Sequence, residues 1–201
     1  MIYIIIALLI WSSSFTAGKY AYSMFDPAMA IELRFIIASL IVLPFFIKTY
    51  PLIEKRIRTK LWGVSFLMFP IGIFMQFMGL FYTSASSAVV VIGTEPILVL
   101  VLGFLLFKTK VALYDWALSA IAFLGICLLV LGSKDDGAAD LFGLILVFLA
   151  GAGFALSLYV AKEVMARLDN KVYTSTILVQ GMMLCLPISL VLVKNWQINF
   201  N

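Results

Sequence analysis

The sequence contains no histidine, and this absence excludes several kinds of membrane enzyme. Haem b ligation, Ser/His proteolysis and zinc proteolysis through an HExxH motif all require an imidazole side chain. The two cysteines, Cys127 and Cys185, lie in separate apolar stretches, so a framework of disulfides is not expected. The sequence also lacks the usual thiolate or carboxylate metal clusters. We therefore expect no enzyme, no cofactor and no bound metal.

Charged residues are scarce as well, at 12% of the 201 residues, whereas 64% are hydrophobic. A soluble domain carries about twice that share of charge, so the composition predicts a polytopic helical membrane protein. The basic residues form no aromatic-interleaved patch, so no nucleic-acid partner is expected. The first apolar stretch ends in Lys19 rather than in a small-residue cleavage site, so we expect no cleavable signal peptide.

Seven apolar segments are long enough to cross a bilayer core of about 30 Å as helices. They are residues 2–22, 28–47, 61–82, 88–107, 113–132, 141–161 and 172–193. The connectors between them are short, which predicts one compact bundle without a soluble domain. The predicted fold class is an all-α polytopic membrane protein with seven transmembrane helices.

The basic residues of the connectors predict the orientation of the bundle. With a cytoplasmic N-terminus, the inner connectors 48–60, 108–115 and 162–171 carry ten Lys and Arg residues, and the outer connectors and tail carry three. This positive-inside bias predicts a cytoplasmic N-terminus, in a cell membrane that we expect to be a bacterial inner membrane. A lipid-binding amphipathic patch is the alternative interpretation of the basic run 48–60. The acidic run SKDDGAAD (133–140) then falls in an outer connector.

Glu95, followed at once by Pro96, lies a third of the way along the fourth segment, 88–107. A carboxylate at that depth in a bilayer usually faces a cavity or a charged partner. Pro96 has no N–H to donate to the carbonyl of Ile92, so the helix is expected to kink there. The combination predicts a polar site inside the membrane. Burial of Glu95 against an arginine or lysine purely for packing is the alternative.

Three further charged residues lie within the predicted spans: Lys19 in the first, and Glu32 and Arg34 in the second. Glu32 and Arg34 stand about 200° apart around a helix, so each needs a partner on a different helix. The formal charges of these three residues and Glu95 sum to zero. This balance predicts either mutually paired groups around one outward-facing polar cavity or a buried structural network. Gln76, in the third segment, is a further candidate for the cavity.

A polar stripe follows one face of the first segment, formed by Ser12, Thr16, Lys19 and Ser23 at spacings i, i+4, i+7 and i+11. Such a stripe on a membrane helix normally faces the interior of the bundle. The alternatives are close packing between helices and, for Lys19, extension of its long stem to the outer interface.

The sixth and seventh segments resemble the first two. The small-residue pair Ser14/Gly18 recurs as Gly153/Ser157, and a Leu-Pro pair recurs near the end of the second and seventh segments. A repeat of five helices reverses its direction in the second copy. This inverted-repeat architecture is typical of secondary transporters, whose site lies near the interface of the repeats.

Three stretches resemble motifs of the drug/metabolite transporter superfamily, in its EamA-type ten-helix branch. They are WSSSFTAGKYA (11–21), DPAMAIELRF (26–35, with Arg34 at the usual arginine) and FYTSASSAVVVIGTEPILVLVLGFLLFKTKV (81–111). The resemblance implies that residues 1–132 form one five-helix EamA repeat and residues 141–194 the first two helices of an inverted second repeat. It also implies ATP-independent, alternating-access transport, often export, of small metabolites such as amino acids.

Two features depart from that family pattern. A ten-helix member needs three more helices, so the polar tail KNWQINFN (194–201) predicts a chain truncated after its seventh helix. Lys108 stands where an acidic residue often closes the fourth helix. Because a partial second repeat lacks one wall of the cavity, a second copy of the chain, in a homodimer, is an expected partner.

The leading hypothesis is a transporter that moves a small-molecule solute across the lipid bilayer. The path of the solute or ion is then lined or shaped by Lys19, Glu32, Arg34, Gln76 and Glu95. Glu95 is the candidate carboxylate for coupling to a proton or cation. The main alternative is a non-transporting truncated remnant or membrane scaffold. A retinal protein is disfavoured because no lysine lies inside the seventh segment, and an enzyme because no nucleophile–base pair is present.

Overall fold

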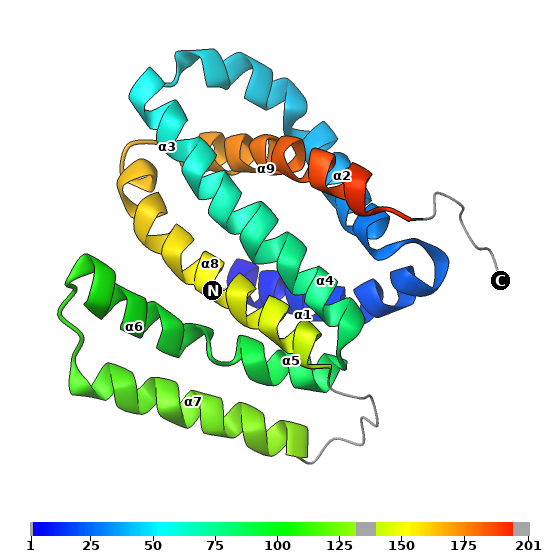
Figure 1. The fold of residues 1–201 in the computed structure, drawn as a ribbon. Helices are drawn as coiled ribbons and strands as arrows, with labels where there is room; N and C mark the ends of the chain where they lie inside the picture. The colour runs from blue at the N-terminus through cyan, green and yellow to red at the C-terminus, as the bar shows by residue number, and fades with distance from the viewer. Residues whose placement is uncertain (1, 132–139, 195–201) are drawn as a thin grey trace.

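The computed structural model describes residues 2–131 and 140–194. The acidic connector before residue 140, the end of the fifth predicted segment at residue 132 and the polar tail after residue 194 lie outside the described residues. The elements are α1 (Ile2–Met24), α2 (Pro27–Thr49), the 3₁₀ helix η1 (Tyr50–Leu52), α3 (Lys55–Phe66), the π-helix η2 (Leu67–Phe74), α4 (Met75–Tyr82), α5 (Ala85–Ile92), α6 (Glu95–Phe107), α7 (Leu113–Leu131), α8 (Leu141–Met165) and α9 (Asn170–Leu192) (Figure 1).

The described residues form helices and no strand, and six helical stretches are long and apolar enough to cross a membrane. α7 adds a shorter apolar helix. The predicted all-α polytopic membrane fold with seven helical passes is thus confirmed. Several helix ends differ from the predicted boundaries by a few residues, and the largest difference is that the third stretch begins at Lys55 rather than at residue 61. The reason is that η1 reverses the chain within three residues, so most of the predicted connector 48–60 is helical.

The helices start and stop at short polar caps. Asp26 Oδ1 accepts a hydrogen bond from Ala28 N at 3.0 Å, and a proline follows in the first helical turn of α2. Asp169 Oδ1 accepts in the same way from Lys171 N at 2.8 Å at the start of α9. These contacts satisfy N–H groups that have no partner inside the helix. α6 ends where Lys108 adopts a left-handed conformation with φ of 51°.

α8 lies at the centre of the bundle (Figure 1). It packs against the continuous helix α3–η2–α4 on one side and against α5 and α6 on another. α9 packs mainly against α2 and α3, and α7 contacts α5 and α6 at the outside. The apolar core formed by these helices includes the fully buried Ile31, Leu61, Leu80 and Val164. This order brings α4, α6 and α8 together around the candidate site.

Glycines allow α8 to approach its neighbours closely. A Cβ atom on Gly79 of α4 would lie 2.7 Å from the backbone oxygen of Gly143 of α8, so neither position has room for a larger side chain. Further along α8, a Cβ atom on Gly151 would lie 3.2 Å from Cγ of Glu95. Small residues at such crossings let membrane helices pack backbone to backbone. They set the distance between the walls of the site.

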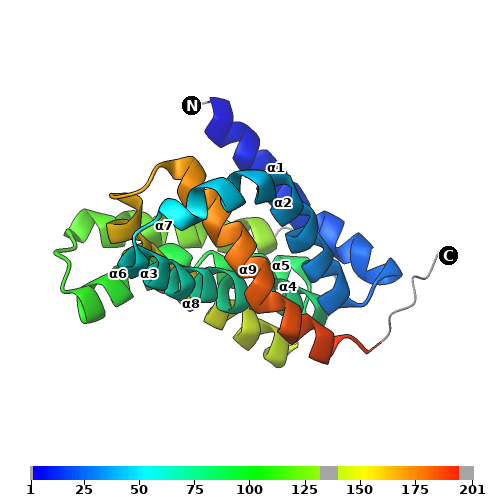
Figure 2. The ribbon, with the colours of Figure 1, turned by 90° about the horizontal axis from the view of Figure 1, so that it is seen from above.

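α1 lies along the edge of the bundle beside α2 and α4 (Figure 2). The predicted polar stripe does not face the interior, because Ser12, Thr16 and Ser23 are exposed. Gly18 is the only buried residue among those described in α1, and a Cβ atom there would lie 3.2 Å from the ring of Phe77. The packed face of α1 is therefore the face of its small residues. Exposed Ser12 and Ser23 donate to backbone carbonyls of their own helix.

Candidate functional site

The membrane span that carries Glu95 is broken at that residue. α5 ends at Ile92 and α6 begins at Glu95, so two residues separate two helices where the sequence predicted one segment with a kink at Pro96. Both N and Oγ1 of Thr94 donate to the carbonyl of Val91, at 3.0 and 2.6 Å. Pro96 follows in the first turn of α6 and has no N–H to restore the regular pattern. Irregular backbone at membrane depth is tolerated where protein or a cavity surrounds it.

A cavity of about 340 Å³ lies beside this break, and we call it the Glu95 cavity. Helices α1, η2, α4, α5, α6, α8 and α9 all contribute side chains to its wall. The lining residues are Trp11, Met68, Gln76, Ile92, Glu95, Phe154, Ser157, Leu158, Ala161, Met165 and Tyr173. It is thus an apolar and aromatic space with two conspicuous polar groups, one carboxyl and one amide.

The two polar groups have unsatisfied oxygens. Oε1 of Glu95 and Oε1 of Gln76 are buried from solvent and have no hydrogen-bond partner among residues 2–131 and 140–194. Gln76 as a whole is 1% exposed. Most buried polar atoms in native proteins are hydrogen bonded, and leaving one unpaired costs about 1–3 kcal/mol. Two such atoms on one cavity wall indicate a site whose bound partner donates hydrogen bonds.

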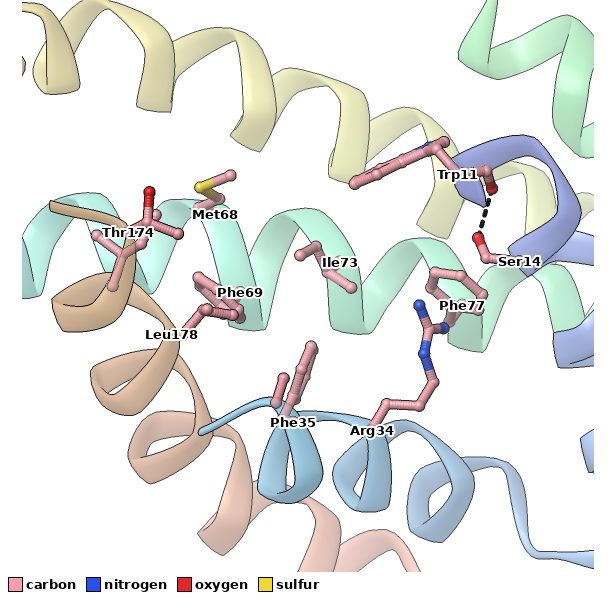
Figure 3. A pocket seen from close by; sticks show the side chains of 12 residues that line it. Trp11, Ser14, Arg34, Phe35, Met68, Phe69, Ile73, Phe77, Thr174 and Leu178 are labelled. Atoms are coloured by element: carbon pink, nitrogen blue, oxygen red, sulfur yellow. Dashed lines mark hydrogen bonds between the residues drawn. The ribbon is translucent and has the colours of Figure 1, made fainter. Parts of the chain in front are cut away.

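A second cavity of about 340 Å³ adjoins the first, and we call it the Arg34 cavity. Trp11 and Met68 line both cavities, so these two side chains form the wall between them. Arg34 reaches from α2 toward α4 and places its guanidinium 4.1 Å from the ring centroid of Phe77, a cation–π contact. Figure 3 shows this arrangement, with Trp11 and Ser14 of α1 on the far side of the cavity.

The other two predicted site residues lie elsewhere. Lys19 Nζ donates to the carbonyl of Thr83 at 2.6 Å, next to the turn between α4 and α5. Glu32 is buried and its Oε2 accepts from Ser189 Oγ of α9 at 3.0 Å. Neither residue lines the Glu95 cavity or the Arg34 cavity. Both therefore contact neighbouring helices at positions away from these spaces.

The charges inside the spans do not form one cluster. Glu32 and Arg34 contact different helices, as their separation around α2 predicted. In residues 2–131 and 140–194, no ion pair joins Glu32, Arg34 and Glu95. The mutually paired group that the balanced charges predicted is thus not formed among them. The reason is geometric, since Glu32 points to α9 while Glu95 lies across the bundle on α6.

Several lining residues were not predicted from the sequence. Trp11 comes from α1, whereas Phe154, Ser157 and Tyr173 come from the consecutive helices α8 and α9, more than 100 residues later. Ser157 Oγ donates to the carbonyl of Phe154 at 2.7 Å, so its lone pairs remain free to accept a hydrogen bond. The signals at these positions were the family-like motif that begins at Trp11 and the repeated small-residue pair that includes Ser157. Nothing in the local sequence shows which helix faces meet, and this decides their role.

A profile of the EamA-like transporter family matches residues 1–131. The chain belongs to the EamA-like transporter family. This membership agrees with the resemblance noted for the first two helices and for the hairpin that carries Glu95.

Individual relatives of this EamA chain are bacterial. A Haemophilus influenzae protein named only as uncharacterized is 50% identical over 110 residues, covering 55% of this chain and 86% of that protein. A second Haemophilus influenzae protein, named an uncharacterized transporter, is 40% identical over 83 residues, covering 40% of this chain and 49% of that protein. YetK of Bacillus subtilis, also named an uncharacterized transporter, is 27% identical over 194 residues, covering 92% of this chain.

The chain spans 58% of the length of YetK and 49% of the second Haemophilus influenzae protein, about half of each named transporter. No solved structure matches the chain. The arrangement of the two cavities is therefore described from this structure alone.

Proposed function

We propose that this EamA-family chain moves a small metabolite, such as an amino acid, across a bacterial inner membrane by ATP-independent alternating access. The proposed direction is export, and the N-terminus is cytoplasmic. Residues 1–132 form the first five-helix repeat, and residues 141–194 form the first two helices of an inverted second repeat. The solute passes through the Glu95 cavity, with the Arg34 cavity beside it.

The observation that carries this proposal is the pair of partnerless oxygens on Glu95 and Gln76 beside a broken membrane helix. Buried Glu32 also has one oxygen without a partner among the described residues, but it lines neither cavity. The unpaired oxygens of Glu95 and Gln76 differ because they share the wall of a cavity, where a bound molecule can satisfy them. Broken helices at the site are a recurrent feature of secondary transporters. A cavity bounded by unpaired oxygens and a broken helix supports reversible binding of a solute rather than a purely structural role.

The position of the Glu95 cavity supports the proposed direction. The cavity extends from Glu95 to Met165 and Tyr173, which lie at the last turn of α8 and the first turn of α9. With a cytoplasmic N-terminus, the connector between these helices is cytoplasmic. Gln76 and Glu95 then lie in the outer half of their spans, and the cavity extends from them toward the cytoplasmic end of α8, the side from which a solute for export would enter.

Substitution of Glu95 tests the proposal. The protein is reconstituted into lipid vesicles loaded with unlabelled amino acids, and exchange with each labelled amino acid outside is measured. We expect Glu95→Gln, which keeps the size of the side chain, to reduce exchange to the level of empty vesicles. Glu54→Gln is the matched control, because Glu54 is exposed and its side chain makes no capping hydrogen bond. The yield of folded protein in the vesicles is compared for all three proteins.

Two outcomes would contradict parts of this proposal. Exchange by Glu95→Gln at the wild-type rate would remove Glu95 from the transport path. Absence of exchange by the wild-type protein for every amino acid tested would favour the alternative of a non-transporting scaffold.

A further inference from the structure

Three side-chain oxygens in the wall of the Glu95 cavity can accept hydrogen bonds. Glu95 and Gln76 present oxygens without partners, and Ser157 presents the lone pairs of a hydroxyl that already donates to its own helix. Within the part of the chain that the structure describes, no lysine or arginine is among the lining residues. The wall thus combines these acceptors and the charge of a carboxyl group with the N–H donors of Gln76 and Trp11 and the hydroxyl of Tyr173. Its complement is a positively charged group that has several N–H donors.

The rest of the wall favours an organic cation over a metal ion. Trp11, Phe154 and Tyr173 contribute three aromatic side chains, whose ring faces attract ammonium groups. A hard metal cation takes about six or more oxygen ligands, and the side chains facing this space supply fewer. The volume of about 340 Å³ is also that of a pocket for a small organic molecule.

Arg34, whose guanidinium could bind a carboxylate, lines a different cavity from the one in which Glu95 could bind an amine. Arg34 lines the neighbouring cavity and not the Glu95 cavity, and Trp11 and Met68 stand between the two spaces. A molecule bound by Glu95 and Gln76 therefore needs no carboxylate group, because Arg34 does not line this cavity. Its body would contact the apolar side chains of Leu158 and the methionines.

We infer that the Glu95 cavity is a binding site for small organic amines, in which Glu95 and Gln76 accept hydrogen bonds from the ammonium group while Trp11 packs against it. This inference deepens the proposed transport function, on which its physiological meaning rests. It names the ammonium group as the feature recognised, with or without a carboxylate on the same molecule.

Equilibrium binding to the full chain in lipid nanodiscs tests the inference. The probes are 2-phenylethylamine, the neutral 2-phenylethanol and the anionic 3-phenylpropionate, which share an aromatic body and differ in the polar group. We expect saturable binding of the amine and none of the alcohol or the carboxylate. Glu95→Gln is expected to weaken amine binding at least about tenfold, as for loss of a charged hydrogen bond. Glu54→Gln, the exposed control, is expected to bind like wild type.

A second pair of variants tests the aromatic contact. Trp11→Phe keeps a ring in the wall and is expected to bind the amine nearly as well as wild type. Trp11→Ala removes the ring and is expected to weaken binding several-fold. Because Trp11 belongs to α1, whose residues are mostly exposed, neither change is expected to prevent folding.

Three results would overturn the inference: equal binding of the alcohol or the carboxylate, unchanged amine binding by Glu95→Gln, or saturable binding of Na⁺ that excludes the amine. The vesicle assay distinguishes this failure from failure of the proposed function. Amine binding without exchange of any solute would contradict transport and leave the binding site established. Glu95-dependent exchange without amine binding would support transport and refute the amine site.

Discussion

Gly79 lies where α4 crosses α8, and its replacement by alanine tests how this crossing is built. The added Cβ atom would lie 2.7 Å from the backbone oxygen of Gly143 and 2.7 Å from Cγ2 of Val147. A backbone atom cannot rotate away, so the two helices must separate. Gln76 lies one turn before Gly79 on α4, so this crossing also places one wall of the Glu95 cavity.

The expected change in the free energy of unfolding of Gly79→Ala combines two opposing effects. Overpacking of a tight contact costs about 1–3 kcal/mol. Replacement of glycine by alanine inside a helix contributes about 1 kcal/mol of stability. The free energy of unfolding should therefore fall by about 0–2 kcal/mol in Gly79→Ala. The matched control is Gly63→Ala in α3, where a Cβ atom would meet nothing within 4 Å. We expect that variant to gain about 0.5–1 kcal/mol, so the two should differ by about 1–3 kcal/mol.

The buried thiol of Cys185, which is 0% exposed, provides the assay. In a Cys127→Ala background, a thiol-reactive fluorophore labels Cys185 only when the bundle opens, so the fluorescence during heating reports unfolding. Both glycine variants are measured in the same lipid nanodiscs as the parent protein. An equal gain in stability for Gly79→Ala and Gly63→Ala would refute the glycine-mediated crossing of α4 and α8.

Two further predictions concern single contacts, measured by the same thermal assay. Ser189→Ala removes the hydroxyl that donates to buried Glu32 at 3.0 Å, and it should lower the free energy of unfolding by about 1–3 kcal/mol. Its control is Ser175→Ala, which should cost less because the buried hydroxyl of Ser175 bonds only to its own helix. Equal losses of stability in the two variants would show that the bond to Glu32 is unimportant. Lys108→Gly relieves a left-handed residue with φ of 51° and should gain up to about 1 kcal/mol. Lys110→Gly serves as its control, and a loss of stability in Lys108→Gly would contradict the conformational argument.

Local chemistry was enough to predict the class of fold and most helix positions. In lipid, the backbone N–H and C=O groups of an apolar run of about twenty residues find hydrogen-bond partners within that run only if it forms a helix. The transmembrane helices could therefore be located without tertiary information. Asp26 before Pro27 marked the start of a helix because both residues suit that position independently of the rest of the chain. The boundary at Lys55 was missed because charged residues were assigned to a connector, whereas they also form a solvent-exposed helical turn.

The polar residues show which features of the site could not be predicted from the local sequence. Glu95 and Gln76 could be recognised as unusual from the sequence, because buried polar groups in a membrane are costly wherever they occur. That they line one cavity, while Glu32 joins Ser189 and Lys19 joins the Thr83 carbonyl, depends on which helix faces meet. The glycines of α8 and the edge position of α1 decide those faces. That polar groups lie within the membrane could be inferred from their positions in apolar segments. Which of them share a site could not, because this depends on contacts between helices that are distant along the chain.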